Sequence, residues 1–353
     1  MYGLNKELTP SPAPAWLINL EECPAALSWS DCGRWLAAGT VTGGICVIEV
    51  ATGITLWVRS AHEKGLHTLC WQPGASVLAS CGQDATVRLW KISREPQLTL
   101  FDEWTINAGG NAWIEHLQWR PDGRQLAVAS GRSVFLFSSE GMPQECCDFP
   151  ESTVSAISWR PAGAQLAVSG YGGVRLFNVL DLNSKPQKLN WKGSLLSLSW
   201  SPDARIIVAG CQDNSLHFWR LPEGHDAMMS GFLYKPVQLC WSRDARWLTS
   251  GGSSKLVLWP FDKKGPEGRA PISIEWHEKP ISALATAVGS RWFASGCRGG
   301  EVAAWRQLSD TSPAARMQLP NRVECLAWSP VKNGKSLAAA SRDGALGIWE
   351  MMQ

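Results

Sequence analysis

The chain contains 11 cysteines and 6 histidines, the residue types best suited to nucleophilic catalysis or metal binding. Their spacing supports neither use. The vicinal pair Cys146-Cys147 lacks the two-residue gap of structural zinc sites, and no histidine lies near it in the sequence. We find no convincing nucleophile-elbow, zinc-protease or phosphate-loop motif. The sequence therefore predicts no catalytic residue, no bound metal and no cofactor.

The composition restricts the classes of partner. The charged fraction is 18% and the net charge only +2, whereas proteins that hold nucleic acid by bulk electrostatics need a strongly basic surface. No apolar run approaches the length that spans a membrane, and no leader-like segment is evident. Most cysteines lie in apolar strand patterns, which is typical of free buried thiols. We expect no nucleic-acid partner, no membrane insertion and a cytoplasmic location, or a nuclear one in a eukaryote.

The elements that must position any site come from a repeat. Eight segments share a pattern of a small or apolar residue, Leu or Ile, one residue, Trp and a turn, and their markers lie about 40 to 48 residues apart. The markers are Trp29, Trp71, Trp119, Trp159, Trp200, Trp241, Ala285 and Trp328. Each copy continues into short stretches that alternate with period two, as strands do. Four short strands per period are what a propeller blade requires.

These copies resemble the WD40 family from about residue 15 to residue 350. In the second copy His62, Ser80, Asp84 and Trp90 stand at the spacings of that family's structural tetrad, in which a histidine, a hydroxyl, an aspartate and a tryptophan join one network. The resemblance implies partial tetrads in four further copies. Their members are Asp213 with Trp219, Thr249 with Trp259, His277 with Ser295 and Trp305, and Asp343 with Trp349; Gly299 replaces the aspartate that would accompany His277.

The predicted fold is all-β: one closed WD40-type propeller of eight four-stranded blades, with seven blades and one irregular copy as the alternative. The last copy lacks an outer strand, and residues 15–22 read as a spare strand before the first copy. Pairing the two would close the last blade and remove an exposed edge. Residues 1–13, which are rich in proline, are expected to form a flexible tail, and residues 14–353 a single domain.

The resemblance also implies where partners bind. In the family, residues just before the tetrad aspartate and at the start of each first strand gather on one face, called the top. The positions that match here are His67, Gln83, Glu115, Arg132, Tyr171, Gln212, Gln238, Arg298, Glu324 and Arg342. A mixture of arginine and aromatic side chains at a rigid mouth is typical of interaction hot spots. Each position taken singly is also compatible with a solvated turn.

We therefore predict a non-enzymatic scaffold that binds one or more partner proteins or peptides on its top face, as a subunit of a larger complex. One alternative is a ligand- or metal-handling propeller, such as a metallochaperone accessory. Cys81, Cys211 and Cys297 lie in separate blades, however, and could not share one metal. Another alternative is an enzyme with a channel-mouth site that uses His67, Glu115 and Glu324. A third option, a second interaction surface, rests on the Arg-Trp pairs at Trp35, Trp247 and Trp292.

Overall fold

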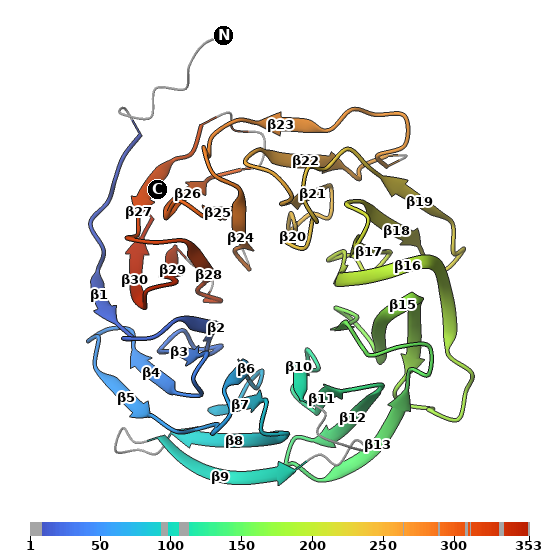
Figure 1. Ribbon diagram of the computed structural model, residues 1–353, viewed down its shortest axis with the longest axis horizontal. Helices are drawn as coiled ribbons and strands as arrows, with labels where there is room; N and C mark the ends of the chain where they lie inside the picture. Colours follow the sequence, from blue (N-terminus) through green and yellow to red (C-terminus); the bar gives the residue numbers. More distant parts are fainter. Residues whose placement is uncertain are drawn as a thin grey trace.

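The described residues form thirty strands around a central axis in the computed structural model, and the ring is closed (Figure 1). The structure describes residues 9–92, 98–105, 113–263, 265–288, 290–307, 310, 312–331 and 335–351. Within these ranges all regular structure is strand. No described segment forms a helix that is long and apolar enough to cross a membrane. Residues 1–8 of the predicted tail lie outside the described ranges. Pro10 accepts a hydrogen bond from the Arg316 backbone N–H (2.8 Å), so this part of the tail lies against the ring.

Three antiparallel sheets follow the first three copies in chain order. The first contains β2 (Pro24–Trp29), β3 (Trp35–Thr40), β4 (Ile45–Glu49) and β5 (Thr55–Val58). The second contains β6 (Leu66–Trp71), β7 (Val77–Gly82), β8 (Thr86–Ile92) and β9 (Leu98–Thr105). The third contains β10 (Ile114–Trp119), β11 (Gln125–Ser130), β12 (Ser133–Ser138) and β13 (Pro143–Asp148).

The fourth and fifth copies share one six-stranded sheet. It contains β14 (Ala156–Trp159), β15 (Gln165–Asn178), β16 (Gln187–Trp200), β17 (Ile206–Cys211), β18 (Leu216–Arg220) and β19 (Asp226–Met229). The sixth copy forms β20 (Leu239–Trp241), β21 (Trp247–Ser250), β22 (Leu256–Pro260) and β23 (Ile272–Ile274). The seventh forms β24 (Ile281–Thr286), β25 (Phe293–Cys297), β26 (Glu301–Trp305) and β27 (Ala315–Gln318).

The prediction of eight separate four-stranded blades is wrong, because the ring contains seven hydrogen-bonded sheets. The reason is β16, whose first half pairs with β15 and whose second half pairs with β17. β15 itself turns back on itself: Val179 N–H donates to Ala164 O (2.8 Å), and Gly172 and Gly173 take positive φ angles at the reversal. Seven sheets agree with the number of blades in the alternative prediction. All eight copies nevertheless lie in the ring, because the inner strand of each copy contacts the inner strand of the next.

The predicted closure by the N-terminal strand is present. β1 (Trp16–Asn19) pairs antiparallel with β30 (Ala345–Glu350), with Trp16 opposite Ile348. β30 in turn pairs with β29 (Ser336–Ser341), and β29 pairs with β28 (Val323–Trp328), so β1 is the outer strand of the last sheet. In Figure 1 this strand, in blue, lies beside the red end of the chain. The pairing covers the outer edge of β30.

The marker tryptophans join neighbouring copies. Five of them donate an Nε1–H hydrogen bond to a backbone carbonyl at the end of the preceding copy's inner strand. These bonds are Trp29 to Ala327 (3.1 Å), Trp71 to Ser28 (3.1 Å), Trp159 to Gln118 (3.0 Å), Trp200 to Ser158 (3.1 Å) and Trp328 to Ala285 (3.1 Å). In the seventh copy the position equivalent to the marker tryptophan is Thr286 and not Ala285. Thr286 pairs with Phe293 of the second strand, as Trp328 pairs with Leu337 in the eighth copy.

One glycine is required for this close packing of adjacent copies. Gly43 has φ +105°, and a Cβ there would lie 1.8 Å from the carbonyl oxygen of His62. The backbones are also joined by a hydrogen bond from His62 N–H to Gly43 O (2.9 Å). The turn of the first sheet therefore supports the segment that carries His62.

Candidate functional site

A hydrogen-bonded chain of four side chains runs through the second sheet. Trp90 Nε1–H donates to Ser80 Oγ (2.8 Å), Ser80 Oγ lies 2.8 Å from His62 Nε2, and His62 Nδ1 lies 3.0 Å from Asp84 Oδ1. The Thr86 hydroxyl also donates to Asp84 (2.8 Å). His62 and Ser80 are fully buried, so each of these polar atoms needs its partner. This network fastens the entering loop, β7, the turn and β8 to one another.

Asp84 is held as a carboxylate. Burial alone would raise its pKa, but hydrogen bonds from His62 and Thr86, together with the charge of His62, bring the pKa down to about 2. The group therefore stays ionised in the folded protein over the physiological range.

The seventh copy builds a related network from a different carboxylate. His277 Nε2 lies 2.8 Å from Ser295 Oγ, and Trp305 Nε1–H donates to the same oxygen (3.1 Å). His277 Nδ1 lies 3.0 Å from Glu301 Oε2. A glutamate at the start of β26 therefore takes the role of the tetrad aspartate, whose position is occupied by Gly299. Burial lowers the pKa of His277, but hydrogen bonds to Cys297 and Glu301 outweigh it and raise the pKa overall.

The prediction that Thr249 is the tetrad hydroxyl of the sixth copy is wrong by one residue. Trp259 Nε1–H donates to Ser250 Oγ (3.3 Å), whereas the buried Thr249 hydroxyl has no hydrogen-bond partner within the described structure. The hairpin between β21 and β22 is one residue shorter than its counterpart, so Leu248 faces Trp259 and Ser250 falls on the tryptophan's side of the sheet.

In two copies the predicted members are present without the full chain of bonds. Asp213 accepts a hydrogen bond from the Ser215 hydroxyl (2.5 Å), while the buried Trp219 packs edge-on to His217 with ring centroids 4.6 Å apart. Asp343 accepts from the Ser341 hydroxyl (2.6 Å), and Trp349 is buried among apolar side chains. The tryptophans of these copies are held mainly by packing.

A hollow on the top face lies where the sixth and seventh copies meet. Its volume is about 370 Å³. We call it the top-face cavity, and it is lined by Asn214, Leu233, Tyr234, Lys235, Val237, Gln238, Gly252, Ser253, Pro280, Ile281, Ser282, Arg298 and Arg322. Two predicted partner-binding residues, Gln238 and Arg298, are brought together here.

The wall of this cavity is both apolar and cationic. Leu233 is 74% exposed and Tyr234 55% exposed, although Tyr234 is anchored by a backbone bond to Gly252 (2.9 Å). The described lining includes Lys235, Arg298 and Arg322 and no carboxylate. Arg322 is partly neutralised from outside the lining by Glu324 at 3.3 Å. The cavity is therefore suited to an anionic group beside an apolar one.

Comparison with known proteins agrees with this architecture. The family described as WD domain, G-beta repeat matches residues 53–91 and 186–220. The B-type cell cycle switch protein ccs52A of Medicago truncatula is 24% identical over 252 residues, 69% of this chain and 51% of that protein. The WD repeat-containing protein 26 homolog of Arabidopsis thaliana is 24% identical over 343 residues, which are 92% of this chain and 48% of that protein. The chain belongs to the WD40-repeat β-propeller family.

This WD40 propeller spans about half the length of the curated relatives it matches. Among solved structures, Sqt1 from Chaetomium thermophilum superposes with a TM-score of 0.82 at 14% identity, covering 97% of this chain and 100% of that chain. A likeness at that identity shows the fold alone. Propellers of this family are typically protein-interaction scaffolds without enzymatic activity.

The remaining predicted top-face residues of the WD40 propeller lie outside the top-face cavity. Most of them are exposed: Glu115, Arg132, Tyr171, Gln212 and Arg342. His67, Gln83 and Glu324 are half-buried; the His67 ring lies 6.0 Å from that of Trp113, and Glu324 pairs with Arg322. The structure thus spreads these eight residues over the copies, and no cavity described for the chain gathers His67, Glu115 and Glu324 as a catalytic group.

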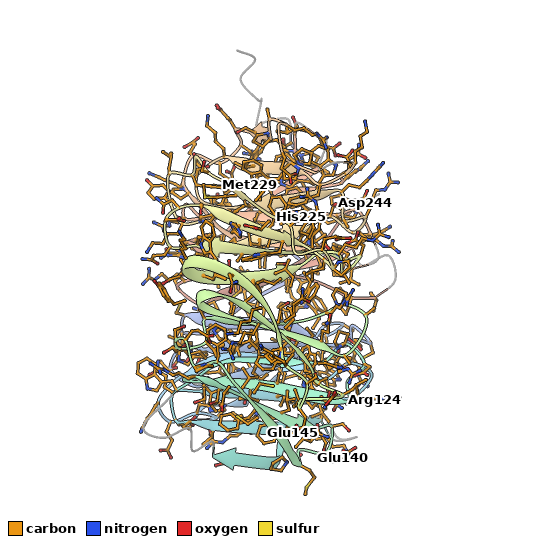
Figure 2. All side chains as sticks on the ribbon, turned by 90° about the vertical axis from the view of Figure 1, so that its right-hand side faces the viewer. Arg124, Glu140, Glu145, His225, Met229 and Asp244 are labelled. Carbon is orange, nitrogen blue, oxygen red and sulfur yellow. The ribbon has the colours of Figure 1, made fainter. Side chains whose placement is uncertain are left out.

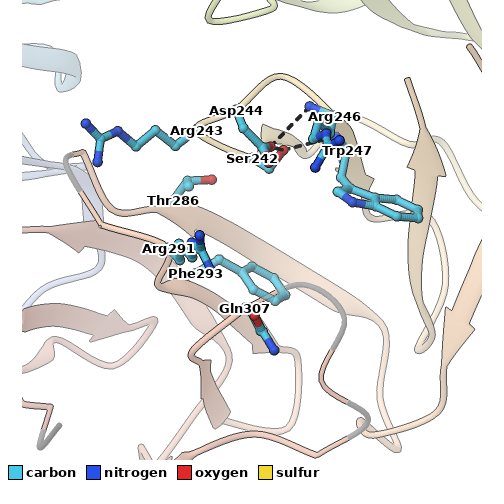
Figure 3. Close-up of a pocket in the computed structure, with 9 residues that line it drawn as sticks. All are labelled: Ser242, Arg243, Asp244, Arg246, Trp247, Thr286, Arg291, Phe293 and Gln307. Atoms are coloured by element: carbon cyan, nitrogen blue, oxygen red, sulfur yellow. Dashed lines mark hydrogen bonds between the residues drawn. The ribbon is translucent and has the colours of Figure 1, made fainter. Parts of the chain in front are cut away.

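The opposite, bottom face carries the turns between first and second strands. Arg124 and Asp244, from two such turns, lie at the same edge of the ring in Figure 2. A second hollow of about 430 Å³ opens there between the sixth and seventh copies, with Arg243, Arg246, Trp247 and Arg291 in its wall (Figure 3).

The three Arg-Trp pairs do not form an exposed aromatic patch. Trp35 is buried and is covered by Arg34, whose guanidinium carbon lies 4.9 Å from the ring centroid. Trp247 and Trp292 are half-buried. Arg306, and not the adjacent Arg291, lies over Trp292 at 6.0 Å. Arg34 and Arg306 thus cover the faces of Trp35 and Trp292 by cation–π contact.

Sequence reasoning missed the residues that make the top-face cavity apolar. Leu233, Tyr234 and Lys235 belong to the connection between β19 and β20, residues 230–238, which is longer than the corresponding connection between β23 and β24, residues 275–280. Their only signal in the sequence is an apolar pair before Lys235-Pro236 outside any strand pattern. It also missed Glu301, because the carboxylate reaches His277 from two residues beyond the tetrad position.

Proposed function

We propose that this WD40 propeller is a non-enzymatic scaffold that binds an acidic, partly apolar segment of a partner protein in the top-face cavity. One observation carries the proposal: three cations and three exposed apolar side chains line a single cavity whose described wall has no carboxylate. An acidic side chain at about 4 Å from one of these cations gains roughly 1 to 4 kcal/mol, depending on how far water is excluded.

The rigidity of the wall supports this proposal. Arg298 N–H donates to Pro280 O (2.9 Å), which joins the turn after β25 to the entry of β24. Ser282 Oγ donates to Val323 O (2.7 Å), which ties β24 to the inner strand of the next copy. Preformed walls lower the ordering cost of binding a peptide. A cavity of this size accommodates a few side chains, and the exposed polar residues around the ring would provide the rim.

We further propose a reducing compartment such as the cytoplasm as its location. All 11 cysteines are free thiols. Burial raises the pKa of six of them to about 11 or 12, and that of Cys81 well above its ordinary value. These seven thiols therefore stay protonated and unreactive.

The test is selection of peptides from a random display library on the full chain, followed by affinity measurement. We expect enriched peptides to combine Asp or Glu with an apolar residue. Arg298→Glu should weaken their binding at least about 10-fold, the loss expected when one close opposite charge becomes a like charge. The matched control is Arg243→Glu, which reverses an arginine in the bottom hollow and should change the affinity less than about 2-fold.

The proposal has two further readouts. Binding should weaken with added salt, because part of the attraction is between partly exposed charges. Partners captured from source cells by cross-linking should be lost with Arg298→Glu and retained with Arg243→Glu. Enrichment of basic or uncharged peptides, or a loss confined to the bottom-face variant, would overturn the proposal.

A further inference from the structure

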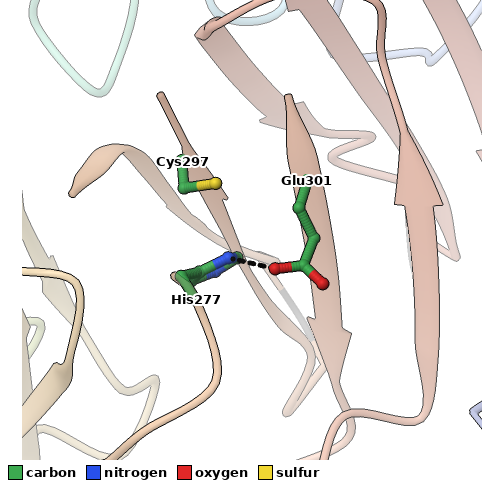
Figure 4. Close-up of side chains that lie close together, drawn as sticks. All are labelled: His277, Cys297 and Glu301. Carbon is green, nitrogen blue, oxygen red and sulfur yellow. Dashed lines mark hydrogen bonds and ion pairs between the residues drawn. The ribbon is translucent and has the colours of Figure 1, made fainter. Parts of the chain in front are cut away.

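Three potential metal ligands from three different elements converge in the seventh copy. His277 lies in the loop before β24, Cys297 is the last residue of β25, and Glu301 is the first residue of β26. One ligand atom from each, the imidazole nitrogen, the thiol sulfur and a carboxylate oxygen, lie within 4.8 Å of one another (Figure 4). Imidazole, thiolate and carboxylate together form a donor set that suits Zn²⁺.

The second copy shows what is unusual here. There, Gly82 occupies the place of Cys297: Gly82 pairs with Leu66 as Cys297 pairs with Ile281. The carboxylate of that copy comes from the turn, at Asp84, and is also bonded to Thr86. Where the second copy has Gly82, Asp84 and Thr86, the seventh has Cys297, Gly299 and Glu301, and two of these three differences place a ligand atom beside the same histidine.

Hydrogen bonds from outside the cluster already orient two of the three ligands. His277 Nε2 lies 2.8 Å from Ser295 Oγ, and the Gly299 N–H donates to Cys297 Sγ at 3.3 Å. Such outer hydrogen bonds fix the orientation of a ligating imidazole and stabilise a ligating thiolate. His277 Nδ1 and Glu301 Oε2 face one another at 3.0 Å, and Cys297 Sγ lies on the same side of the imidazole ring (Figure 4).

We propose that His277, Cys297 and Glu301 bind one Zn²⁺, with a water molecule as the fourth ligand. The Glu301 side chain is 15% exposed, so water reaches the cluster from that side, whereas His277 is closed off. Binding releases the thiol proton, and the Nδ1 proton is lost from a doubly protonated ring or moves to Nε2 of a singly protonated one, so the bound imidazole is neutral. His277 then carries its proton on Nε2 and donates it to Ser295 Oγ, which accepts from Trp305 as well.

The proposed site would stabilise one wall of the top-face cavity. Pro280 and Arg298, which line the cavity, follow closely after His277 and Cys297 in the chain. A metal that joins the loop, β25 and β26 would hold these segments together. This consequence depends on the proposed function, but the metal site itself does not.

The experiment titrates Co²⁺, a coloured substitute for Zn²⁺, into full-length protein stripped of metal with a chelator. We expect one equivalent to bind, with a thiolate-to-cobalt charge-transfer band in the near ultraviolet, and Zn²⁺ to displace it. Cys297→Ala should abolish the band. Glu301→Gln, which keeps a hydrogen-bond partner for His277, should weaken binding at least about 10-fold. The matched control is Cys211→Ala, which removes the buried thiol at the equivalent position of the fifth copy.

The wild-type titration alone can overturn the proposal, whether or not the variants fold. Absence of a charge-transfer band with Co²⁺ in the folded wild-type protein would refute it. So would a band that survives Cys297→Ala, or one that Cys211→Ala removes while Cys297→Ala does not. Circular dichroism of each variant accompanies the titrations, and only peptide-binding measurements, made separately, bear on the scaffold function.

Discussion

Ser80 is the residue on which the buried network of the second copy depends most. Its Oγ accepts from Trp90 Nε1–H and contacts His62 Nε2, both at 2.8 Å, and both partner residues are buried. Ser80→Ala removes this oxygen without opening space for water. Two buried nitrogen atoms then lose their partner, at about 1 to 3 kcal/mol each. We expect the free energy of unfolding to fall by about 2 to 6 kcal/mol.

Two substitutions in the sixth copy serve as matched controls. Ser250→Ala removes a single hydrogen bond, the 3.3 Å contact with Trp259, and should cost only about 1 kcal/mol. Thr249→Val replaces a buried hydroxyl that has no partner in the described structure with a methyl group of similar size. It should raise the free energy of unfolding by about 1 kcal/mol.

Urea unfolding followed by tryptophan fluorescence measures all three effects, since the chain has 21 tryptophans. The midpoints should rank Thr249→Val above wild type, then Ser250→Ala, then Ser80→Ala, with unchanged slope. The reasoning would be refuted by a Ser80→Ala midpoint no lower than that of Ser250→Ala. Destabilisation by Thr249→Val would show instead that its hydroxyl has a partner.

Three further predictions concern acid, backbone space and ring closure. Because the folded pKa of Asp84 is about 2, below its ordinary value of 3.8, its network contributes about 2 kcal/mol of stability that is complete above pH 4 and is lost as the pH falls towards 2. Acid titrations should show this loss in wild type and less of it in Asp84→Asn. Gly43→Ala should lower the thermal midpoint far more than Gly74→Ala: both have positive φ, but only Gly43 meets a backbone oxygen, whereas nothing lies within 4 Å of a Cβ at Gly74. Deleting residues 9–19 should expose the edge of β30 and produce dimers or larger species in size-exclusion chromatography, and a monomer of unchanged stability would contradict that closure matters.

The fold could be predicted because its signal repeats. Five of the seven marker tryptophans donate to a carbonyl on the neighbouring copy, and all seven recur at the blade period because each joins one inner strand to the next. The sheet count could not be predicted in the same way. It depends on how the backbone reverses at Gly172-Gly173 and continues through β16, and the side-chain pattern does not record that continuity.

The candidate site was less accessible to prediction, for a related reason. Ser250 was missed because a hairpin shortened by one residue shifts every facing residue beyond it. Glu301 was missed because its longer side chain reaches the histidine from the first residue of β26, two residues beyond the tetrad position Gly299. The apolar wall at Leu233 lies in the connection between β19 and β20, outside the strands whose pattern repeats, so comparison between copies could not reveal it.

The pairing of β1 with β30 has a consequence for biosynthesis. β1 leaves the ribosome about 330 residues before its partner is complete, which at 5 to 20 residues per second corresponds to roughly 15 to 65 seconds. Throughout that interval the strand has no place in a sheet, and its backbone groups are free to pair with a neighbouring nascent chain on the same messenger RNA. The rate of translation, and not only the stability of the finished ring, would then set the yield of correctly closed molecules.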